Sequence, residues 1–372
     1  PITQSPYIRK IIPKTNVGIE CLKIVRLDTR TVHCANIRFN YAVNCYVKGI
    51  ESEKCNFSHI SFIRSSNITV RDSYFHHAFD YGGGGTGYGV VAMYSSGECL
   101  VENNIFKHLR HSMLLQAGAN GNVFSYNYSI DPYWTGVSLP SNSAGDLVLH
   151  GNYPYANLFE GNICQNIVID DSHGSNGPHN TFLRNRARSY GLVMNSGGLT
   201  DSCNFIGNEI TSNAFFQGLY SLNGVGHYEY GNNIKGSIIP TGTSSDVINS
   251  LYLENIPVFL SSGQFPFCGA PITYNAMSNS AFIRESGIDK TICIELQHTS
   301  INIFSEKKME IFPNPSSAIV NFVEPTKVKL YNNLGELVFG SKSKIKIIDV
   351  SSFPKGIYII RTDFSVAKLI IK

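Results

Sequence analysis

The segments NLFEGNIC (157–164), NTFLRNRA (180–187) and CNFIGNEI (203–210) share one pattern, a short apolar strand with Asn at its sixth position. Two earlier segments, CLVENNIF (99–106) and NVFSYNYS (122–129), follow the same pattern. The aligned residues are Asn104, Asn127, Asn162, Asn185 and Asn208, at spacings of 23, 35, 23 and 23 residues. Ser73 takes this position 31 residues before Asn104. Self-similarity at a fixed period is the signature of a repeat architecture.

The period of 23 residues predicts a parallel β-helix. It is too short for a βαβ unit, which needs roughly 30 residues, and it suits a coil of three short strands separated by turns. At a turn, an Asn side chain can occupy or cap a left-handed backbone conformation. Coils about 4.8 Å apart would then let stacked Asn amides hydrogen-bond in a ladder. We therefore expect an all-β, right-handed parallel β-helix.

Composition agrees with strands and turns and excludes several classes of protein. Charged residues make up only 15%, while Gly (33), Tyr (20) and Phe (22) are plentiful. No stretch approaches the roughly 18 apolar residues of a membrane-spanning helix. Residues 309–372 hold 9 Lys and Arg against 5 Asp and Glu, so the basic excess lies in the tail and does not suggest a nucleic-acid partner.

The nine cysteines contain no CxxC pair, so a structural zinc cluster is not expected. Intervals of 13, 11 and 10 residues separate Cys21, Cys34, Cys45 and Cys55. We expect them to be buried in the core, as free Cys usually is. One or two disulfides remain open in an exported protein.

The residue pattern of the sequence changes at Met309. The segments IFPNPSS (311–317), VKLYNNLGELV (328–338), IIDVSSFPKGIYIIRT (347–362) and KLIIK (368–372) alternate strands with turns. This pattern predicts a small antiparallel β-sandwich. The expected organisation is a β-helix domain over residues 1–283, a linker over 284–308 and a C-terminal domain over 309–372.

Both parts resemble known families. The coil repeat, together with SLYLENIPVFL and FPFCGAP in 250–271, resembles the pectin-lyase-like superfamily of β-helices over about residues 15–275, although Phe265-Pro266 stands where the group has Trp-Pro. The tail resembles the type A sorting domain of the type IX secretion system. The residues that carry this second resemblance are Pro313-Asn314-Pro315, Tyr331-Asn332 to Gly335, Gly356-Ile357-Tyr358 and Lys368 to Lys372.

The second resemblance implies transport across the outer membrane, followed by release or attachment to the cell surface. The type IX secretion machinery would then be a partner of the tail. We expect a monomer without a transmembrane segment.

Two insertions interrupt the coil period. The Ser73–Asn104 interval is 31 rather than 23 residues and holds DYGGGGTGYG (80–89), and the Asn127–Asn162 interval is 35 and holds DPYWTGVSLPSNSAG (131–145). Both follow the ladder position closely, so they should wall the same face of the rod. Tyr133 and Trp134 in the second insertion would either offer rings to the apolar face of a sugar or pack back on the rod.

Counting back from the ladder asparagines places polar residues in rows. Twelve residues before Asn162 and Asn185 stand His150 and His173, which should stack about 4.8 Å apart on adjacent coils. Sixteen residues before Asn104, Asn127 and Asn162 stand Tyr88, His111 and Asp146. The predicted catalytic cluster consists of Tyr88, Arg110, His111, Asp146, His150, Asp171 and His173. The alternative is a structural row of turn histidines bonded to the backbone.

Further candidates would bind the substrate. Arg184, Arg186 and Arg188 alternate along a strand and would face one way, either as a solvated face or as a grip for an anionic polymer. His76 and His77 end a strand before the glycine-rich loop and would join the site. The predicted substrate-binding set is Tyr133, Trp134, Arg184, Arg186, His76 and His77.

These residues leave three functions open. A polysaccharide lyase or C5-epimerase must neutralise a uronate carboxylate and remove the adjacent proton, which Arg, His and Tyr can do. A glycoside hydrolase needs two carboxylates, which Asp146, Asp170 and Asp171 could supply. A non-catalytic surface β-helix would only bind glycans. No cofactor is certain: calcium stays open but has few carboxylates, and zinc would find only two ligands in His150 and His173.

Overall fold

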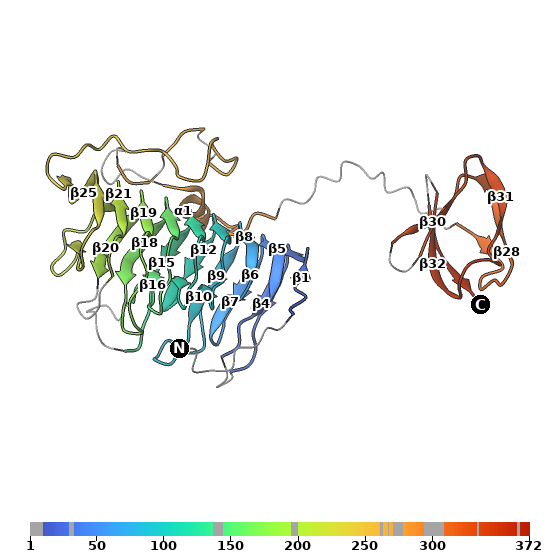
Figure 1. Ribbon diagram of the computed structural model, residues 1–372, viewed down its shortest axis with the longest axis horizontal. Coiled ribbons are helices and arrows are strands. Elements are labelled where there is room, and N and C mark those ends of the chain that lie inside the picture. The colour runs from blue at the N-terminus through green and yellow to red at the C-terminus, as the bar shows by residue number, and fades with distance from the viewer. Residues whose placement is uncertain are drawn as a thin grey trace, which may run out of the picture. The chain divides into compact units, whose positions relative to one another are not determined.

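The computed structural model describes residues 10–29, 33–136, 144–194, 200–260, 263–266, 268–270, 278–293, 309–332, 335–362 and 365–372. The chain divides into two compact units, Pro1–Cys293 and Ile294–Lys372, and each is described by itself. The predicted all-β fold is confirmed: a parallel β-helix is followed by small antiparallel sheets (Figure 1).

Three faces, each built from parallel strands of successive coils, form the β-helix. Face A contains β1 (Lys14–Thr15), β2 (Gly18–Glu20), β5 (Ala42–Lys48), β8 (Ser66–Arg71), β11 (Leu100–Glu102), β14 (Val123–Ser125), β17 (Leu158–Glu160), β19 (Thr181–Leu183), β21 (Asn204–Ile206) and β24 (Tyr228–Tyr230). Face B contains β3 (Lys23–Val25), β6 (Glu51–Glu53), β9 (Tyr74–His76), β12 (Ile105–Lys107), β15 (Tyr128–Ile130), β22 (Glu209–Ile210), β25 (Asn232–Ile234) and the antiparallel β26 (Ser237–Ile239).

Face C carries the candidate site. It contains β4 (Ile37–Asn40), β7 (Ser58–Ile63), β10 (Tyr88–Met93), β13 (His111–Leu115), β16 (Leu147–Leu149) and β23 (Leu219–Ser221). Two long strands, β18 (Ile163–Ile169) and β20 (Arg186–Met194), run from face B into face C. Inside the rod, a column of phenylalanines stacks from coil to coil, for example Phe159, Phe182 and Phe205 with ring centroids 5.1 and 5.3 Å apart.

The expected Asn ladder is present between faces A and B. Asn162 accepts hydrogen bonds from Asn127 N–H (3.0 Å) and Asn127 Nδ2 (2.9 Å), and its own Nδ2 donates to Asn185 Oδ1 (2.9 Å). The left-handed residue at each turn is the one before the ladder position, such as Arg184 (φ 53°) before Asn185. The ladder Asn therefore caps the turn rather than occupying its left-handed position. A second ladder between faces C and A, Asn122–Asn157–Asn180, was not predicted.

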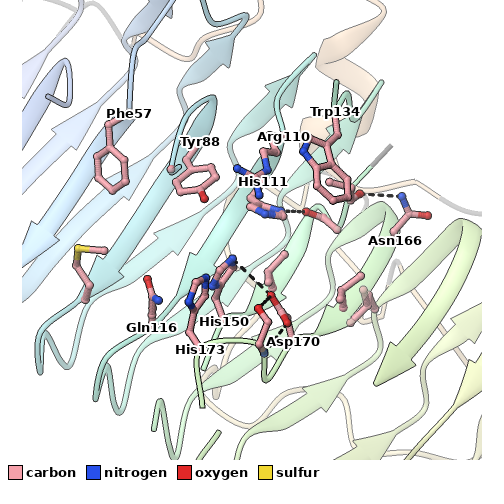
Figure 2. A pocket seen from close by; sticks show the side chains of 18 of the residues that line it. Phe57, Tyr88, Arg110, His111, Gln116, Trp134, His150, Asn166, Asp170 and His173 are labelled. Atoms are coloured by element: carbon pink, nitrogen blue, oxygen red, sulfur yellow. Dashed lines mark hydrogen bonds and ion pairs between the residues drawn. The ribbon is translucent and has the colours of Figure 1, made fainter. Parts of the chain in front are cut away.

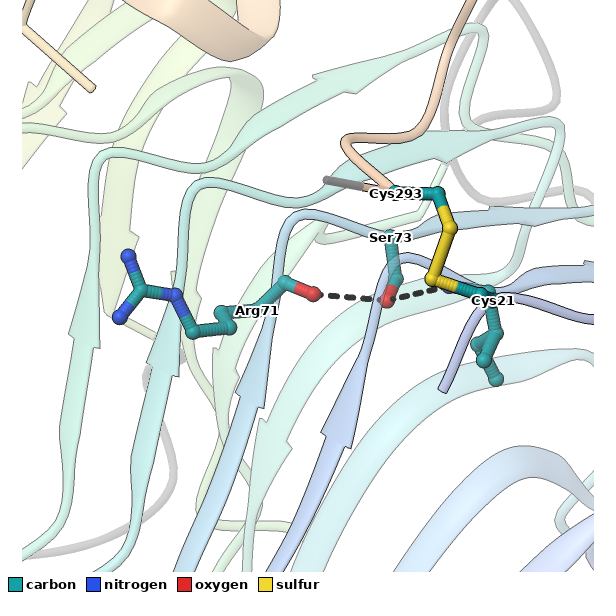
Figure 3. Close-up of a disulfide and its surroundings, with 5 residues drawn as sticks. Cys21, Arg71, Ser73 and Cys293 are labelled. Carbon is teal, nitrogen blue, oxygen red and sulfur yellow. Dashed lines mark hydrogen bonds between the residues drawn. A yellow bond between two sulfur atoms is a disulfide. The ribbon is translucent and has the colours of Figure 1, made fainter. Parts of the chain in front are cut away.

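The end of the first unit folds back onto the rod. Helix α1 (Ser280–Glu285) places Arg284, whose guanidinium donates to the Asn103 side chain (2.8 Å) and backbone O (2.6 Å). A disulfide joins Cys21 to Cys293 (Figure 3). The preceding residue, Ile292, donates its N–H to Asp72 O (2.9 Å). Residues 284–293, which the sequence assigns to a linker, thus pack on the β-helix.

The sequence predicts that the four early cysteines are buried in the core, and the structure agrees for two of them. Cys45 and Cys55 are buried free thiols and Cys34 is half-buried, whereas Cys21 belongs to the disulfide.

The second unit pairs two antiparallel sheets. One runs β27 (Ile311–Phe312), β28 (Ile319–Thr326), β31 (Ile345–Asp349), and the other β30 (Leu337–Gly340), β29 (Lys329–Tyr331), β32 (Gly356–Arg361), β33 (Val366–Ile371). They share a small core that includes Val320, Leu330, Ile360 and Leu369. Within the residues described, no helix has the length and apolarity that a bilayer crossing requires.

Candidate functional site

A cavity of about 1050 Å³ lies on face C. This volume is at the upper end of the roughly 300–1,000 Å³ of ligand pockets. Figure 2 shows Tyr88, Arg110, His111, His150 and His173 directed toward it from successive coils. Five of the seven predicted catalytic residues, together with Trp134, thus line one space.

The two insertions build one wall of the cavity, as their positions in the repeat predict. Thr135 N–H of the second insertion donates to Tyr81 O of the first (3.3 Å). Gly84 and Gly85 line the cavity from the first loop and Trp134 lines it from the second. Residues 137–143 of the second insertion lie outside the described residues.

His111 is held in one neutral form. Its Nδ1 lies 2.7 Å from Gly145 O, and because a carbonyl oxygen can only accept, Nδ1 carries the proton. Burial lowers the pKa of His111 well below its ordinary value, and nearby His150 and Arg110 lower it further. The ring therefore stays uncharged near neutral pH, with a lone pair on Nε2, which has no hydrogen-bond partner among the described residues.

Arg110 lies between two aromatic rings beside His111. Its guanidinium carbon is 5.6 Å from the centroid of Tyr88 and 5.2 Å from that of Trp134, and Nη1 donates to Gly82 O (2.6 Å). Within the described part of the chain, Arg110 Nε and Trp134 Nε1 are buried donors without a partner. Buried donors without partners often mark the place of an absent ligand or water. Burial also raises the pKa of Tyr88, which keeps its hydroxyl protonated.

A second polar group adjoins His111 in the lining of the cavity. The rings of His150 and His173 stack with centroids 4.7 Å apart, close to the spacing predicted from the repeat. His150 Nε2 lies 3.6 Å from Asp170 Oδ2, and Asp170 also accepts from Ser172 N–H (2.8 Å) and Oγ (2.9 Å). Burial lowers the pKa of His150, whereas Asp170 acts in the opposite direction. The His111 and His150 rings meet edge to face at 5.5 Å.

Asp146 does not lie in the row of Tyr88 and His111. Met113 pairs with Leu147, so Asp146 stands opposite Ser112, one residue out of register with His111. A shift of one residue turns a strand side chain to the opposite face. Asp146 is fully buried, accepts from the Gln165 and Asn166 N–H groups, and does not line the cavity. Desolvation raises its pKa to about 7.

Asp171, Tyr133, His76 and His77 are also absent from the lining. The carboxylate that reaches the cavity is Asp170, one residue before the predicted Asp171. Tyr133 stacks on His108 with centroids 4.9 Å apart. His76 Nε2 lies 3.2 Å from Glu51 Oε1 on face B.

Arg184 and Arg186 hold the protein together instead of lining a binding surface. The buried Arg184 guanidinium donates to three backbone carbonyls, those of Val247, Ile248 and Ala270. Arg186 forms a buried ion pair with Glu209. The expectation that they face one way fails because Arg184 lies in the turn and only Arg186 and Arg188 lie in β20.

One group of side chains has metal-ligand spacing among the described residues, namely Glu51, Glu53 and His76. Lys23 Nζ lies 2.9 Å from Glu51 and 3.0 Å from Glu53, so an ammonium already forms ion pairs with both carboxylates. In the described lining of the cavity, Asp170 is the single carboxylate. Neither place offers the several free oxygen ligands that calcium requires.

Several lining residues escaped the sequence reasoning, namely His33, Arg38, Phe57, Gln116, Asn166 and Tyr190. Gln116 lies beside His150, because Leu115 pairs with Leu149, but counting twelve residues back from Asn127 gives Leu115 and misses Gln116 by one residue. His33 and Arg38 come from an early coil that carries no ladder Asn, so counting could not reach them.

Comparison with known families identifies the tail. Residues 310–372 match the family described as Secretion system C-terminal sorting domain. The chain is therefore exported, to the medium or to the cell surface. Neither the curated proteins nor the solved structures contain a match. The family match covers the tail and not the β-helix, so the resemblance of the β-helix to pectin-lyase-like proteins stays a prediction from sequence.

Proposed function

We propose that this exported β-helix is a lyase that cleaves an acidic polysaccharide beside a uronate. The observation that carries the proposal is the neutral His111 next to Arg110, with Tyr88 protonated, in one cavity. These are a base, a cation and an acid, the three groups that an elimination beside a carboxylate needs.

The residues divide the reaction between them. Arg110 pairs with the uronate carboxylate, which makes the hydrogen on the adjacent carbon C5 more acidic. His111 Nε2 takes that proton, and the electron pair left on C5 forms the C4–C5 double bond. The C4–O bond to the neighbouring sugar breaks, and the leaving oxygen takes the proton of the Tyr88 hydroxyl. The products are a chain with a free hydroxyl and an unsaturated uronate.

Between turnovers the Tyr88 phenolate must regain a proton from solvent and His111 must lose the one it gained, and His150 and His173 serve this second step. The His150 ring touches the edge of His111, and the exposed His173 stacks on His150. Asp170 stabilises the protonated form of His150. This row can carry the proton from His111 to solvent between turnovers.

Hydrolysis is a poorer fit to this cavity. A glycoside hydrolase places two carboxyl groups on either side of the scissile bond. Asp170 is the single carboxylate in the described lining, and Asp146 faces the interior of the rod. An epimerase would need the same base and cation as a lyase, but it would return a proton to C5 without chain cleavage.

The test is a screen of the full chain against acidic polysaccharides, following ultraviolet absorbance of the unsaturated uronate and the appearance of reducing ends. We expect both signals to rise together with at least one polymer. His111→Gln should then reduce the rate by about 10²–10⁴-fold, the usual contribution of general base catalysis. His179→Gln, an exposed histidine outside the cavity, is the matched control and should leave the rate unchanged.

Other outcomes would overturn the proposal. Reducing ends without absorbance would indicate a hydrolase. Exchange of the C5 hydrogen with D₂O in an intact polymer would indicate an epimerase. Binding without either change would leave a glycan-binding protein.

A further inference from the structure

The cavity extends along the rod. Its lining begins with Arg38 on β4 and ends with Leu219 on β23, and it includes residues from β7, β10, β13, β16, β18 and β20 between them. Adjacent strands lie about 4.8 Å apart, so this lining spans on the order of 30 Å. A polymer can therefore occupy binding positions on both sides of Arg110 and His111.

The side toward β23, here called the aliphatic flank, consists of Val168, Val193 and Leu219, whereas the neighbouring Ile167 belongs to the core inside the rod. Val148, Val168 and Val193 are paired across β16, β18 and β20, which makes a continuous apolar strip. The polar groups beside this strip, Asn166 and Tyr190, are uncharged.

The permanent positive charges of the described lining lie at the centre and on the opposite side. Among the described lining residues the arginines are Arg110 at the centre and Arg38 on β4. Residues 137–143 and 195–199, which are not described, contain no ionisable side chain in the sequence. Lys235 stands nearby, but its Nζ donates to Gln217 O (3.0 Å) and it does not line the cavity.

This distribution of charged and apolar side chains favours some polysaccharides over others. A polymer of uronates alone would place a carboxylate against the aliphatic flank, where it would lose water without gaining a cation. A neutral sugar with a methyl or acyl group would bury that group against Val168, Val193 and Leu219, which is favourable.

We infer that the substrate is a heteropolymer in which the uronate bound at Arg110 is joined to a neutral 6-deoxy or O-acylated sugar seated on the aliphatic flank. This inference rests on the proposed function for the position of the uronate. It makes the flank the part of the site that selects the substrate.

The first experiment measures binding to the full-chain His111→Gln variant, which keeps the substrate intact. The two probes are size-matched oligosaccharides, one of uronates alone and one in which uronates alternate with 6-deoxyhexoses. We expect calorimetry to show at least about tenfold tighter binding of the alternating probe, the effect of one apolar group in a fitted pocket. Equal or tighter binding of the uronate probe would overturn the inference.

The second experiment adds charge to the flank. Leu219→Lys, at a position that is 45% exposed, should shift binding toward the uronate probe by about tenfold. Val225→Lys, at a position 71% exposed and outside the cavity, is the matched control and should leave the preference unchanged. An unchanged preference in Leu219→Lys would show that the flank does not contact the substrate.

Cleavage by the native chain separates the two proposals. If the alternating probe binds preferentially but neither probe is cleaved, the lyase proposal fails and the ligand class stands. If the uronate probe is cleaved faster than the alternating one, the lyase stands and the ligand class is wrong.

Discussion

At the scale of single residues, burial decides the charge of the groups in and under the cavity. Burial lowers the pKa of His111, and it lowers the pKa of the fully buried His59 to about 3. The unfolded chain therefore takes up protons at these positions below about pH 6.5 that the folded chain does not. These histidines make the folded state less stable as the pH falls below that value.

Asp146 has the opposite effect. Its pKa rises from 3.8 to about 7 on folding, so between these values the folded chain holds a proton that the unfolded chain releases. The stability that this proton contributes is complete below pH 3.8 and is lost as the pH rises through 7. Above that pH, the native fold contains a buried carboxylate that has an oxygen, Oδ1, without a partner among the described residues.

Asp146→Asn should remove this loss of stability at rising pH. The amide oxygen can still accept from the Gln165 and Asn166 N–H groups, and no charge forms. We expect the melting temperature of the variant to stay level between pH 6 and 8, where that of the native chain falls. Thermal melts across this range measure it, with Asp171→Asn, a half-exposed neighbour of the cavity, as the control. Parallel curves for native and Asp146→Asn chains would contradict the raised pKa.

At the scale of the coil, the Asn ladder carries the structure from one turn to the next. Asn162 has no exposed surface, and its amide uses both its donor and acceptor capacity, with Phe124 O (2.8 Å) as a further acceptor. Asn162→Ala removes hydrogen-bond partners from buried groups on the two neighbouring coils, those of Asn127 and Asn185, and each buried group left unpaired costs about 1–3 kcal/mol. We expect chemical denaturation to show that the free energy of unfolding of the variant is lower by several kcal/mol.

Asn204→Ala is the matched control for the ladder. Asn204 is half-buried in β21, and its side chain donates to Thr181 Oγ1 (2.9 Å). The Asn204→Ala substitution should lower the free energy of unfolding by about 1 kcal/mol, the net value of an ordinary hydrogen bond. Equal losses in the two variants would show that the ladder adds nothing beyond one pair of bonds.

The same element explains which parts of the site could be predicted from sequence. His150 and His173 each stand twelve residues before a ladder Asn, and the segments that join each histidine to its ladder Asn have the same length and run side by side, so counting places them correctly. Asp146 fails because the turn between Leu149 and Asn157 is one residue longer than the turn between Leu115 and Asn122, and a shift of one residue reverses the direction of a side chain. The second ladder was visible in the sequence as the first residue of the aligned segments at 122, 157 and 180, but only one Asn position was counted.

At the scale of the whole molecule, the end of the β-helix unit is fixed to its early coils. The Cys21–Cys293 disulfide joins residues 272 positions apart, and Arg284 fixes the preceding helix to Asn103. Cross-linking distant residues limits the unfolded chain and typically stabilises a fold by about 2–4 kcal/mol. Export through the secretion pathway takes the chain to compartments where such a bond persists.

Replacing both cysteines, Cys21→Ser with Cys293→Ser, should therefore lower the melting temperature of the β-helix by about 4–10 °C. Cys34→Ser changes a free, half-buried thiol in the next coil and should leave it nearly unchanged. The sorting domain has its own core, so its transition should be the same in all three chains. Calorimetry with and without a reductant checks this, since the reductant should lower the β-helix transition of the native chain and leave that of the double variant in place. A native transition that is insensitive to reductant would show that the closure depends on the non-covalent contacts of Arg284 and the strands beneath it.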